Sequence, residues 1–131
     1  PMWRTGTPEQ DAASYDAELT DVVLDLVHLG LGPDGHTASL FPGSAALTAD
    51  PARRVVVNDD PLGTNPLTRL TFTYGQIARA RLVVVTVAGA EKAEALRRVL
   101  DGDPTAPASA VTADEVLWLV DPPARGASGP L

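Results

Sequence analysis

The stretch RLVVVTVAGAEKAEALRRVLDG, residues 81–102, decides the architecture of this chain. Its first part is rich in β-branched residues and ends at Gly89, which predicts a strand. Its second part predicts a helix with Gly102 just past its end. The apolar residues expected on the buried face of that helix are Ala93, Leu96 and Leu100. A further strand, EVLWLVD at 115–121, completes a strand–helix–strand unit, which is typical of neighbouring parallel strands.

Working outward toward the N-terminus, the remaining pattern predicts a helix, three strands and a short helical turn. The predicted ranges are a helix at 8–20, strands at 25–31, 53–59 and 69–74, and a helical turn at 75–80. Thr7 and Pro8 suit the start of the first helix. Strand 25–31 has little alternation, so we expect it to be buried on both faces. The two strands 53–59 and 69–74 lie too close for a crossover helix, which favours an antiparallel or edge arrangement. The predicted fold class is α/β, a layered open sheet with parallel core strands and flanking helices.

Composition narrows the class of function. The chain has 131 residues, enough for one domain, and a net charge of −7 with ten basic residues. An acidic chain without a basic cluster argues against non-specific nucleic-acid binding. No apolar run approaches the roughly 20 residues of a membrane helix, so no membrane partner is expected. The chain has no cysteine, which fits a reducing cytoplasm. It opens on Pro1 rather than Met, and we expect further residues upstream.

The segment LGLGPDGHTASLFPG, residues 29–43, follows the strand 25–31 and carries His36. Ligands in open α/β sheets bind beyond the carboxyl ends of the parallel strands, which is where this segment lies. We interpret His36 as a general base for water. Free N–H groups at Gly30, Gly32 and Gly35, with a helical turn starting at His36, are expected to bind an anion or oxyanion. The alternative is that Asp34 only caps the turn and His36 is solvated.

Three other residues are interpreted from their positions. His28 lies within the strand and is expected to be a packed or hydrogen-bonded histidine, largely buried. Lys92 opposes the helix dipole at the ligand edge, which predicts that it binds a phosphate or sugar oxygen. The alternative is a solvated lysine. Arg69 begins its strand and either binds a phosphate or forms a surface ion pair with Asp59 or Asp60.

These residues carry a resemblance. DLVHLGLGPDGHTASLFPG resembles the signature of 6-phosphogluconolactonases, within the larger family of sugar-phosphate isomerases, deaminases and lactonases. RLTFTY, VVVTVAGAEKAEALRRVLDGD and EVLWLVD resemble later blocks of the same family. The resemblance implies a Rossmann-like fold and hydrolysis of 6-phosphoglucono-1,5-lactone in the pentose phosphate pathway, without metal or cofactor. It also implies that His36 is the catalytic base and that substrate contacts come from Gly32, Asp34, Gly35, Arg69 and Lys92.

The chain departs from the family pattern in two ways. Family members are much longer and carry a phosphate loop in an N-terminal half that has no counterpart here. Residues 1–121 are therefore interpreted as the C-terminal portion of a lactonase domain, with 122–131 as a disordered tail and the N-terminal half as the expected partner. The loop before Arg69 also lacks the lysine usual in the family.

Two alternatives stay open. A glucosamine-6-phosphate deaminase or isomerase shares the Asp-Gly-His turn, although TASLFPG favours the lactonase. The other is an inactive fragment that lacks the N-terminal phosphate loop. If the upstream half supplies strands to the sheet, this segment alone also has an unpaired edge and uncovered apolar surface. For the isolated segment we expect poor solubility or self-association.

Overall fold

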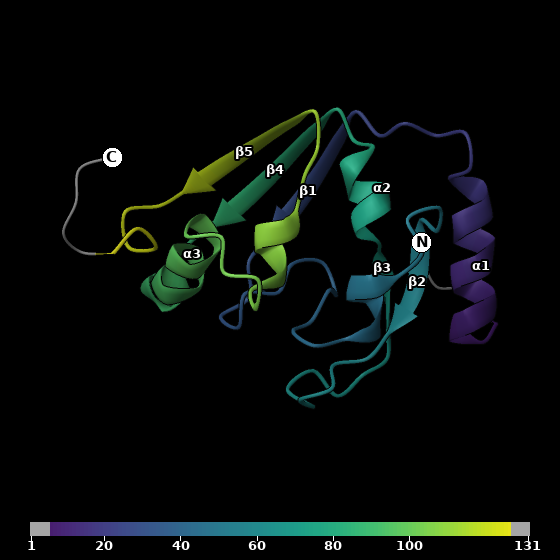
Figure 1. The fold of residues 1–131 in the computed structure, drawn as a ribbon, viewed down its shortest axis with the longest axis horizontal. Helices are drawn as coiled ribbons and strands as arrows, with labels where there is room; N and C mark the ends of the chain where they lie inside the picture. Colours follow the sequence, from purple (N-terminus) through teal and green to yellow (C-terminus); the bar gives the residue numbers. More distant parts are fainter. Residues whose placement is uncertain (1–5, 127–131) are drawn as a thin grey trace.

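The computed structural model describes residues 6–126, whose strands form two sheets (Figure 1). The first sheet has three parallel strands in the order β1–β4–β5, which are Leu26–Gly30, Leu82–Val87 and Glu115–Val120. The second sheet pairs β2, Val55–Asn58, with β3, Arg69–Phe72, in antiparallel fashion. The predicted parallel core and the predicted antiparallel pair are both confirmed.

The helices follow the predicted order. They are α1 (Pro8–Glu18), α2 (Tyr74–Ala78) and α3 (Ala93–Leu100), with 3₁₀ turns η1 (Ala45–Thr48), η2 (Ala90–Lys92) and η3 (Pro107–Ala110). Helix α1 begins as predicted, since the Gln10 N–H donates to the Thr7 hydroxyl oxygen at 3.2 Å and the Thr7 N–H donates to the Gln10 side chain at 3.1 Å. No helix within residues 6–126 has the length and apolar character needed to cross a membrane.

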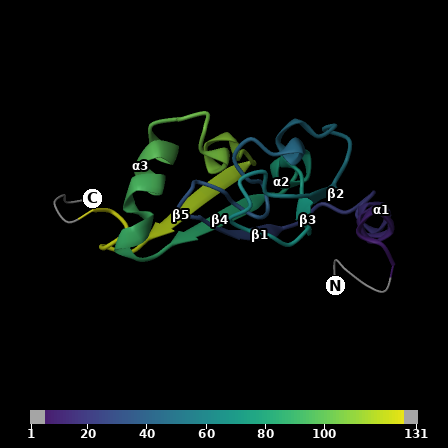
Figure 2. The same cartoon turned by 90° about the horizontal axis from the view of Figure 1, so that it is seen from below.

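One face of the three-stranded sheet carries the main core. The buried residues of β1 and β4 on this face are Val27, Leu29, Val83, Val85 and Val87. Helix α3 covers this face (Figure 2), with Ala95, Leu96 and Val99 as its buried residues. The expected face of α3 was therefore partly wrong, since Leu100 is 67% exposed. The buried stripe runs through Ala95, Leu96 and Val99, and Leu100 is the last residue of the helix.

The other face of this sheet is exposed in the described chain. Alternate residues of β1 point outward, and Leu26 is 53% exposed. The expectations that β1 is buried on both faces and that His28 is buried were wrong. Strands alternate their side chains between faces, and no described element packs on this one. The hydrogen bond expected for His28 is present, because its Nε2 lies 2.7 Å from Thr86 Oγ1.

The end of the described chain also differs from expectation. Residues 122–126, which we expected to begin a disordered tail, form turns after β5. Ala124 is fully buried, and its N–H donates to Asp121 Oδ1 at 2.8 Å. Residues 127–131, the rest of the expected tail, lie outside the described part of the chain.

Asp16 fastens α1 to the second sheet. Its Oδ1 accepts hydrogen bonds from the N–H groups of Arg54 at 2.6 Å and Val55 at 3.0 Å. Burial by itself raises the pKa of Asp16, but the hydrogen bonds from Val55 and Arg54, together with Arg53, hold it below its ordinary value of 3.8. The carboxylate therefore stabilises the fold in its ionised form.

This contact predicts an acid sensitivity. A carboxyl whose pKa is lower in the folded state stabilises the fold above its unfolded pKa of about 4 and loses that contribution as pH falls through the folded pKa. We expect Asp16→Asn to flatten the loss of stability below about pH 4 and to lower stability at pH 7 by about 1 kcal/mol. Urea unfolding at pH 7, 5 and 3.5 measures both effects. The control is Asp25→Asn, because the Asp25 side chain is 82% exposed. Equal pH profiles for wild type and Asp16→Asn would contradict this role.

Candidate functional site

Asp34 holds the imidazole of His36 in one orientation. Asp34 Oδ1 accepts the His36 backbone N–H at 3.0 Å and lies 2.5 Å from His36 Nδ1. The His36 side chain is 23% exposed, and it follows the carboxyl end of β1 in the chain. Because Nδ1 is bound to a carboxylate, Nε2 is the ring nitrogen that can exchange a proton with a ligand. This arrangement is typical of a histidine that acts as a general base.

Two glycines make room for this histidine. A Cβ added to Gly32 would lie 2.1 Å from His36 Nδ1, so the ring rests directly against the Gly32 backbone. Gly35 has a φ of +90°, and a Cβ there would lie 2.8 Å from Ala106 Cβ. Both positions therefore require glycine for packing reasons.

The backbone donors of these glycines are already used inside the turn. The Gly32 N–H donates to the His36 carbonyl at 2.8 Å, and the Gly35 N–H donates to the Gly32 carbonyl at 2.9 Å. The expectation of free N–H groups at Gly32 and Gly35 was therefore wrong. The two groups close the loop around His36, which fits a role in shaping the turn.

The segment after His36 also differs from expectation. Residues 37–40 form a tight turn rather than the start of a helix, with the Leu40 N–H donating to the Thr37 carbonyl at 2.9 Å. The Thr37 hydroxyl donates to the Gly30 carbonyl at 2.7 Å and ties the turn back to β1. Phe41, which is 2% exposed, places its ring 5.2 Å from the His36 ring. A helix N-terminus is thus absent from residues 36–41, and the buried Phe41 supports the imidazole instead.

The 3₁₀ turn η3, which is distant in sequence, holds the turn that carries His36 by a hydrogen bond. The Ala108 N–H donates to the Gly35 carbonyl at 2.9 Å. The Tyr74 hydroxyl donates to the Pro107 carbonyl at 2.6 Å, which joins α2 to η3. Burial raises the pKa of Tyr74 to about 12, so the phenol remains a donor at any physiological pH. The position of His36 therefore depends on residues about 70 places later in the chain.

A second carboxylate, Asp60, acts on His36 electrostatically. It lies in the loop between β2 and β3, is 8% exposed, and accepts hydrogen bonds from Leu62 and Asn65. The hydrogen bond from the Asn65 side chain lowers the pKa of Asp60 most, and the positive charge of protonated His36 adds a smaller lowering. From the sequence, Asp60 was considered only as an ion-pair partner of Arg69. No local signal relates it to His36, because only the tertiary fold relates the two loops.

The two cations expected to bind substrate are free of acidic partners in the described chain. Lys92 ends the 3₁₀ turn η2 and caps the N-terminus of α3, which follows β4, the neighbour of β1 in the sheet. Lys92 and His36 therefore follow the carboxyl ends of adjacent parallel strands. Arg69 is exposed at the start of β3. Thr71, two residues later in the same strand, accepts the Ser39 N–H with its hydroxyl oxygen at 3.1 Å.

Five of the other described arginines form ion pairs with carboxylates. These are Arg53, Arg54, Arg81, Arg97 and Arg98. Arg79, like Arg69, makes no ion pair within residues 6–126. The surface ion pair considered for Arg69 with Asp59 or Asp60 is not formed, so its guanidinium remains open to an anion.

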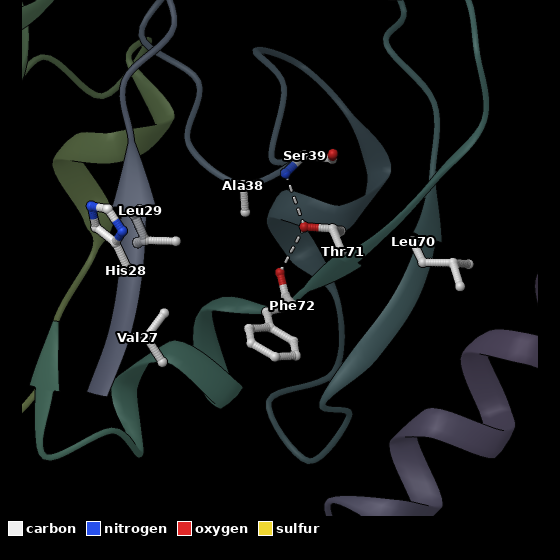
Figure 3. Close-up of a pocket in the computed structure, with 8 residues that line it drawn as sticks. All are labelled: Val27, His28, Leu29, Ala38, Ser39, Leu70, Thr71 and Phe72. Atoms are coloured by element: carbon white, nitrogen blue, oxygen red, sulfur yellow. Dashed lines mark hydrogen bonds between the residues drawn. The ribbon is translucent and has the colours of Figure 1, made fainter. Parts of the chain in front are cut away.

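A cavity of about 270 Å³ lies between β1 and β3 (Figure 3), and His36 is not among its lining residues. It is lined by Val27, His28, Leu29, Ala38, Ser39, Leu70, Thr71 and Phe72. Within residues 6–126, no cluster of three or more histidine, cysteine or acidic side chains has the arrangement of a metal site.

The sequence of this chain matches a known protein family and is similar to curated members of it. The sequence model of the family described as glucosamine-6-phosphate isomerases/6-phosphogluconolactonase matches residues 1–118. A 6-phosphogluconolactonase of Synechocystis is 44% identical over 127 residues, covering 87% of this chain and 51% of its own length. A 6-phosphogluconolactonase of Mycobacterium tuberculosis is 36% identical, covering 89% of this chain and 44% of its own length. The chain thus spans about half the length of these curated relatives.

Solved structures likewise match this chain over about half of their own length. The crystal structure of a devB protein superposes with a TM-score of 0.81 at 26% identity, over 95% of this chain and 56% of that one. The 6-phosphogluconolactonase of Thermotoga maritima superposes with a TM-score of 0.73 at 30% identity, over 85% of this chain and 50% of that one. The chain is similar to about half of a larger fold.

Proposed function

The chain belongs to the family of glucosamine-6-phosphate isomerases and 6-phosphogluconolactonases, and we propose that it carries the catalytic turn of a 6-phosphogluconolactonase. The proposed reaction is hydrolysis of 6-phospho-D-glucono-1,5-lactone to 6-phosphogluconate, the lactonase step of the oxidative pentose phosphate pathway. The observation that carries this proposal is the Asp34–His36 pair, which follows the carboxyl end of a parallel strand with Nδ1 bound and the ring partly exposed. We further propose a cytoplasmic setting, although one relative is named as chloroplastic.

In the proposed mechanism His36 takes a proton from water. Its Nε2 accepts the proton as the water oxygen bonds to the lactone carbonyl carbon, which becomes tetrahedral. The bond from that carbon to the ring oxygen then breaks, and the imidazolium returns the proton to the leaving oxygen. The products are a carboxylic acid and a hydroxyl group, so atoms and charge balance without an added reagent.

The neighbouring carboxylates support this proton transfer. Asp34 fixes the tautomer and orientation of His36, and it stabilises the imidazolium that forms. Asp60 adds a second negative charge to the surroundings of that imidazolium. The N–H groups of Gly32 and Gly35 are bonded within the turn and are not assigned to the substrate. The two glycines instead leave the space that lets the imidazole lie close to the backbone.

The phosphate of the substrate requires local cations. The chain has a net charge of −7, so its overall field repels an anionic sugar phosphate. Lys92 and Arg69 are cations without an acidic partner in residues 6–126, and we assign phosphate or sugar contacts to them. Lys92 also lies where the N-terminal dipole of α3 favours an anion.

A direct assay tests the function. Hydrolysis of 6-phosphoglucono-1,5-lactone is measured for this chain alone and for this chain fused behind the N-terminal half of the Synechocystis relative. We expect the fusion to hydrolyse the lactone and to leave glucosamine-6-phosphate unchanged. Release of ammonia from glucosamine-6-phosphate would instead support a deaminase. Failure of the folded fusion to act on either substrate would contradict the proposal.

Lys92→Ala tests the phosphate contact. Because the substrate phosphate is the anion that Lys92 is proposed to hold, we expect KM for the phosphorylated lactone to rise about 10–100-fold. KM for glucono-1,5-lactone, which has no phosphate, should change little. Arg79→Ala is the matched control, since Arg79 is an exposed cation that, like Lys92, has no ion pair in residues 6–126. Equal effects of Lys92→Ala on both lactones would show that Lys92 does not bind the phosphate.

A further inference from the structure

We infer that Asn58 of β2 and Thr71 of β3 are positioning residues for His36, because together they hold a strained turn that directly follows it. The inference rests on the proposed role of His36 as the base. It adds to that role two buried side chains of the second sheet, which act through the backbone of the turn rather than on the substrate.

The turn at residues 37–40 contains a backbone conformation that its sequence does not favour. Among residues 6–126, Ala38 is the one non-glycine residue with a positive φ, at +49°. The Leu40 N–H donates to the Thr37 carbonyl at 2.9 Å, which makes Ala38 the first central residue of the turn. Glycine is preferred at this position when φ is positive, and a residue with a side chain is disfavoured there by about 5–30-fold. The turn therefore needs contacts from other segments to hold it.

The second sheet holds Ser39, the next residue of the turn, by both of its backbone polar groups. The Ser39 N–H donates to the Thr71 hydroxyl oxygen at 3.1 Å (Figure 3), and Asn58 Nδ2 donates to the Ser39 carbonyl at 2.7 Å. The Thr71 hydroxyl donates its own hydrogen to the Phe72 carbonyl at 3.0 Å, so its oxygen serves Ser39 as an acceptor. We call the two bonds to Ser39 the Ser39 clamp. Asn58 and Thr71 are 3% and 1% exposed, so water hardly competes for the clamp.

Asn58 also holds the segment that places Phe41 against the imidazole. Its Nδ2 donates to the Ser44 hydroxyl oxygen at 2.9 Å, and its Oδ1 accepts the Ala46 N–H at 3.2 Å. The bonds of Asn58 therefore reach the chain on both sides of Phe41, whose ring lies 5.2 Å from the ring of His36. One buried amide thus links the turn after His36 to the aromatic contact of its ring.

The clamp comes from the same two strands as one of the proposed substrate cations. Arg69 pairs with Asn58 in the register of β2 and β3, and Thr71 lies two residues further along β3. Release of the turn would therefore move His36 relative to Arg69, while Arg69 keeps its place in the strand. A displacement of about 1 Å at a catalytic group costs on the order of 10²-fold in rate. We expect a partial release to lower kcat and to change KM little.

Thr71→Val tests the clamp, because valine is close to threonine in shape but cannot accept the Ser39 N–H. The variant is made in the fusion with the N-terminal half of the Synechocystis relative. We expect kcat for the phosphorylated lactone to fall about 5–30-fold, the factor by which the conformation of Ala38 is disfavoured, with KM little changed. Thr71→Ser keeps the hydroxyl and should keep most of the turnover. Hydrogen exchange at the Ser39 amide should be faster in Thr71→Val than in Thr71→Ser.

Asn58→Leu tests the other half of the clamp. Leucine is similar to asparagine in shape and removes the donor to the Ser39 carbonyl. We expect a fall in kcat at least as large as that of Thr71→Val, because the support of Phe41 is lost as well.

Ala38→Gly provides a rescue that a merely structural role would not allow. Glycine adopts a positive φ without the cost of a side chain, so Ala38→Gly should restore much of the kcat lost in Thr71→Val. Thr73→Val is the matched control, since Thr73 is also 1% exposed and its hydroxyl accepts the Gln76 N–H at 3.1 Å. This control should unfold at a lower temperature and keep its kcat.

Three results would overturn the inference. They are wild-type kcat in Thr71→Val, a loss of kcat that Thr71→Ser shares, and a loss that Ala38→Gly does not restore. If Thr71→Val does not fold, Ala38→Gly must recover the fold together with the turnover, and its failure to do so would also contradict the clamp. An inactive wild-type fusion would count against the proposed function instead, and exchange at the Ser39 amide would still decide whether Thr71 holds the turn.

Discussion

His36→Ala is expected to lower lactone turnover by about 10²–10⁴-fold, the usual contribution of a general base. The expected loss is mainly in kcat, because His36 is assigned to the reacting water rather than to the phosphate.

The measurement uses the fusion with the N-terminal half of the Synechocystis relative, assayed directly for lactone hydrolysis. Thermal unfolding of the same variant shows whether the fold is kept, since Phe41 loses its contact with the ring. Asp34→Asn is the companion variant. It keeps an acceptor for the His36 backbone N–H but removes the charge beside Nδ1, so an intermediate loss is expected. Near-normal turnover of His36→Ala would move the base elsewhere.

Gly32→Ala is expected to lower turnover by about 10²-fold or more without touching a reactive group. The added methyl would lie 2.1 Å from His36 Nδ1 and 2.2 Å from its Cε1, so the ring must leave its place. A displacement of about 1 Å at a catalytic group costs on the order of 10²-fold in rate. The bond between Asp34 and His36 should break in the same movement.

The control separates displacement from lost stability. Gly102 has a φ of +74° and open space around its Cα, so Gly102→Ala introduces backbone strain far from His36. We expect Gly102→Ala to be destabilised by about 1–2 kcal/mol and to keep its kcat. Gly32→Ala should show the reverse pattern, with a modest change in the unfolding midpoint and a large loss of kcat. If both variants keep their kcat, the backbone of Gly32 does not set the position of the imidazole.

Local sequence determined most of the secondary structure. Thr7 and Pro8 set the start of α1, because a hydroxyl acceptor and a fixed φ suit the first turn of a helix. Gly102 ends α3 in a positive-φ conformation that favours glycine. The β-branched run in β4 and the strand–helix–strand order also predicted the parallel core. The apolar run that ends at Gly30 was sufficient to predict that His36 follows the carboxyl end of β1.

Tertiary structure decided what surrounds those elements. Whether His28 is buried depends on what covers its face, which a strand pattern does not specify, and it is exposed here. The donors of Gly32 and Gly35 were consumed by a loop closure that involves the His36 carbonyl. Asp60 and η3 reach the His36 turn only because the chain folds back on itself. Propensity and periodicity depend on interactions within a few residues, whereas burial, hydrogen-bond partners and electrostatic neighbours depend on contacts between distant segments.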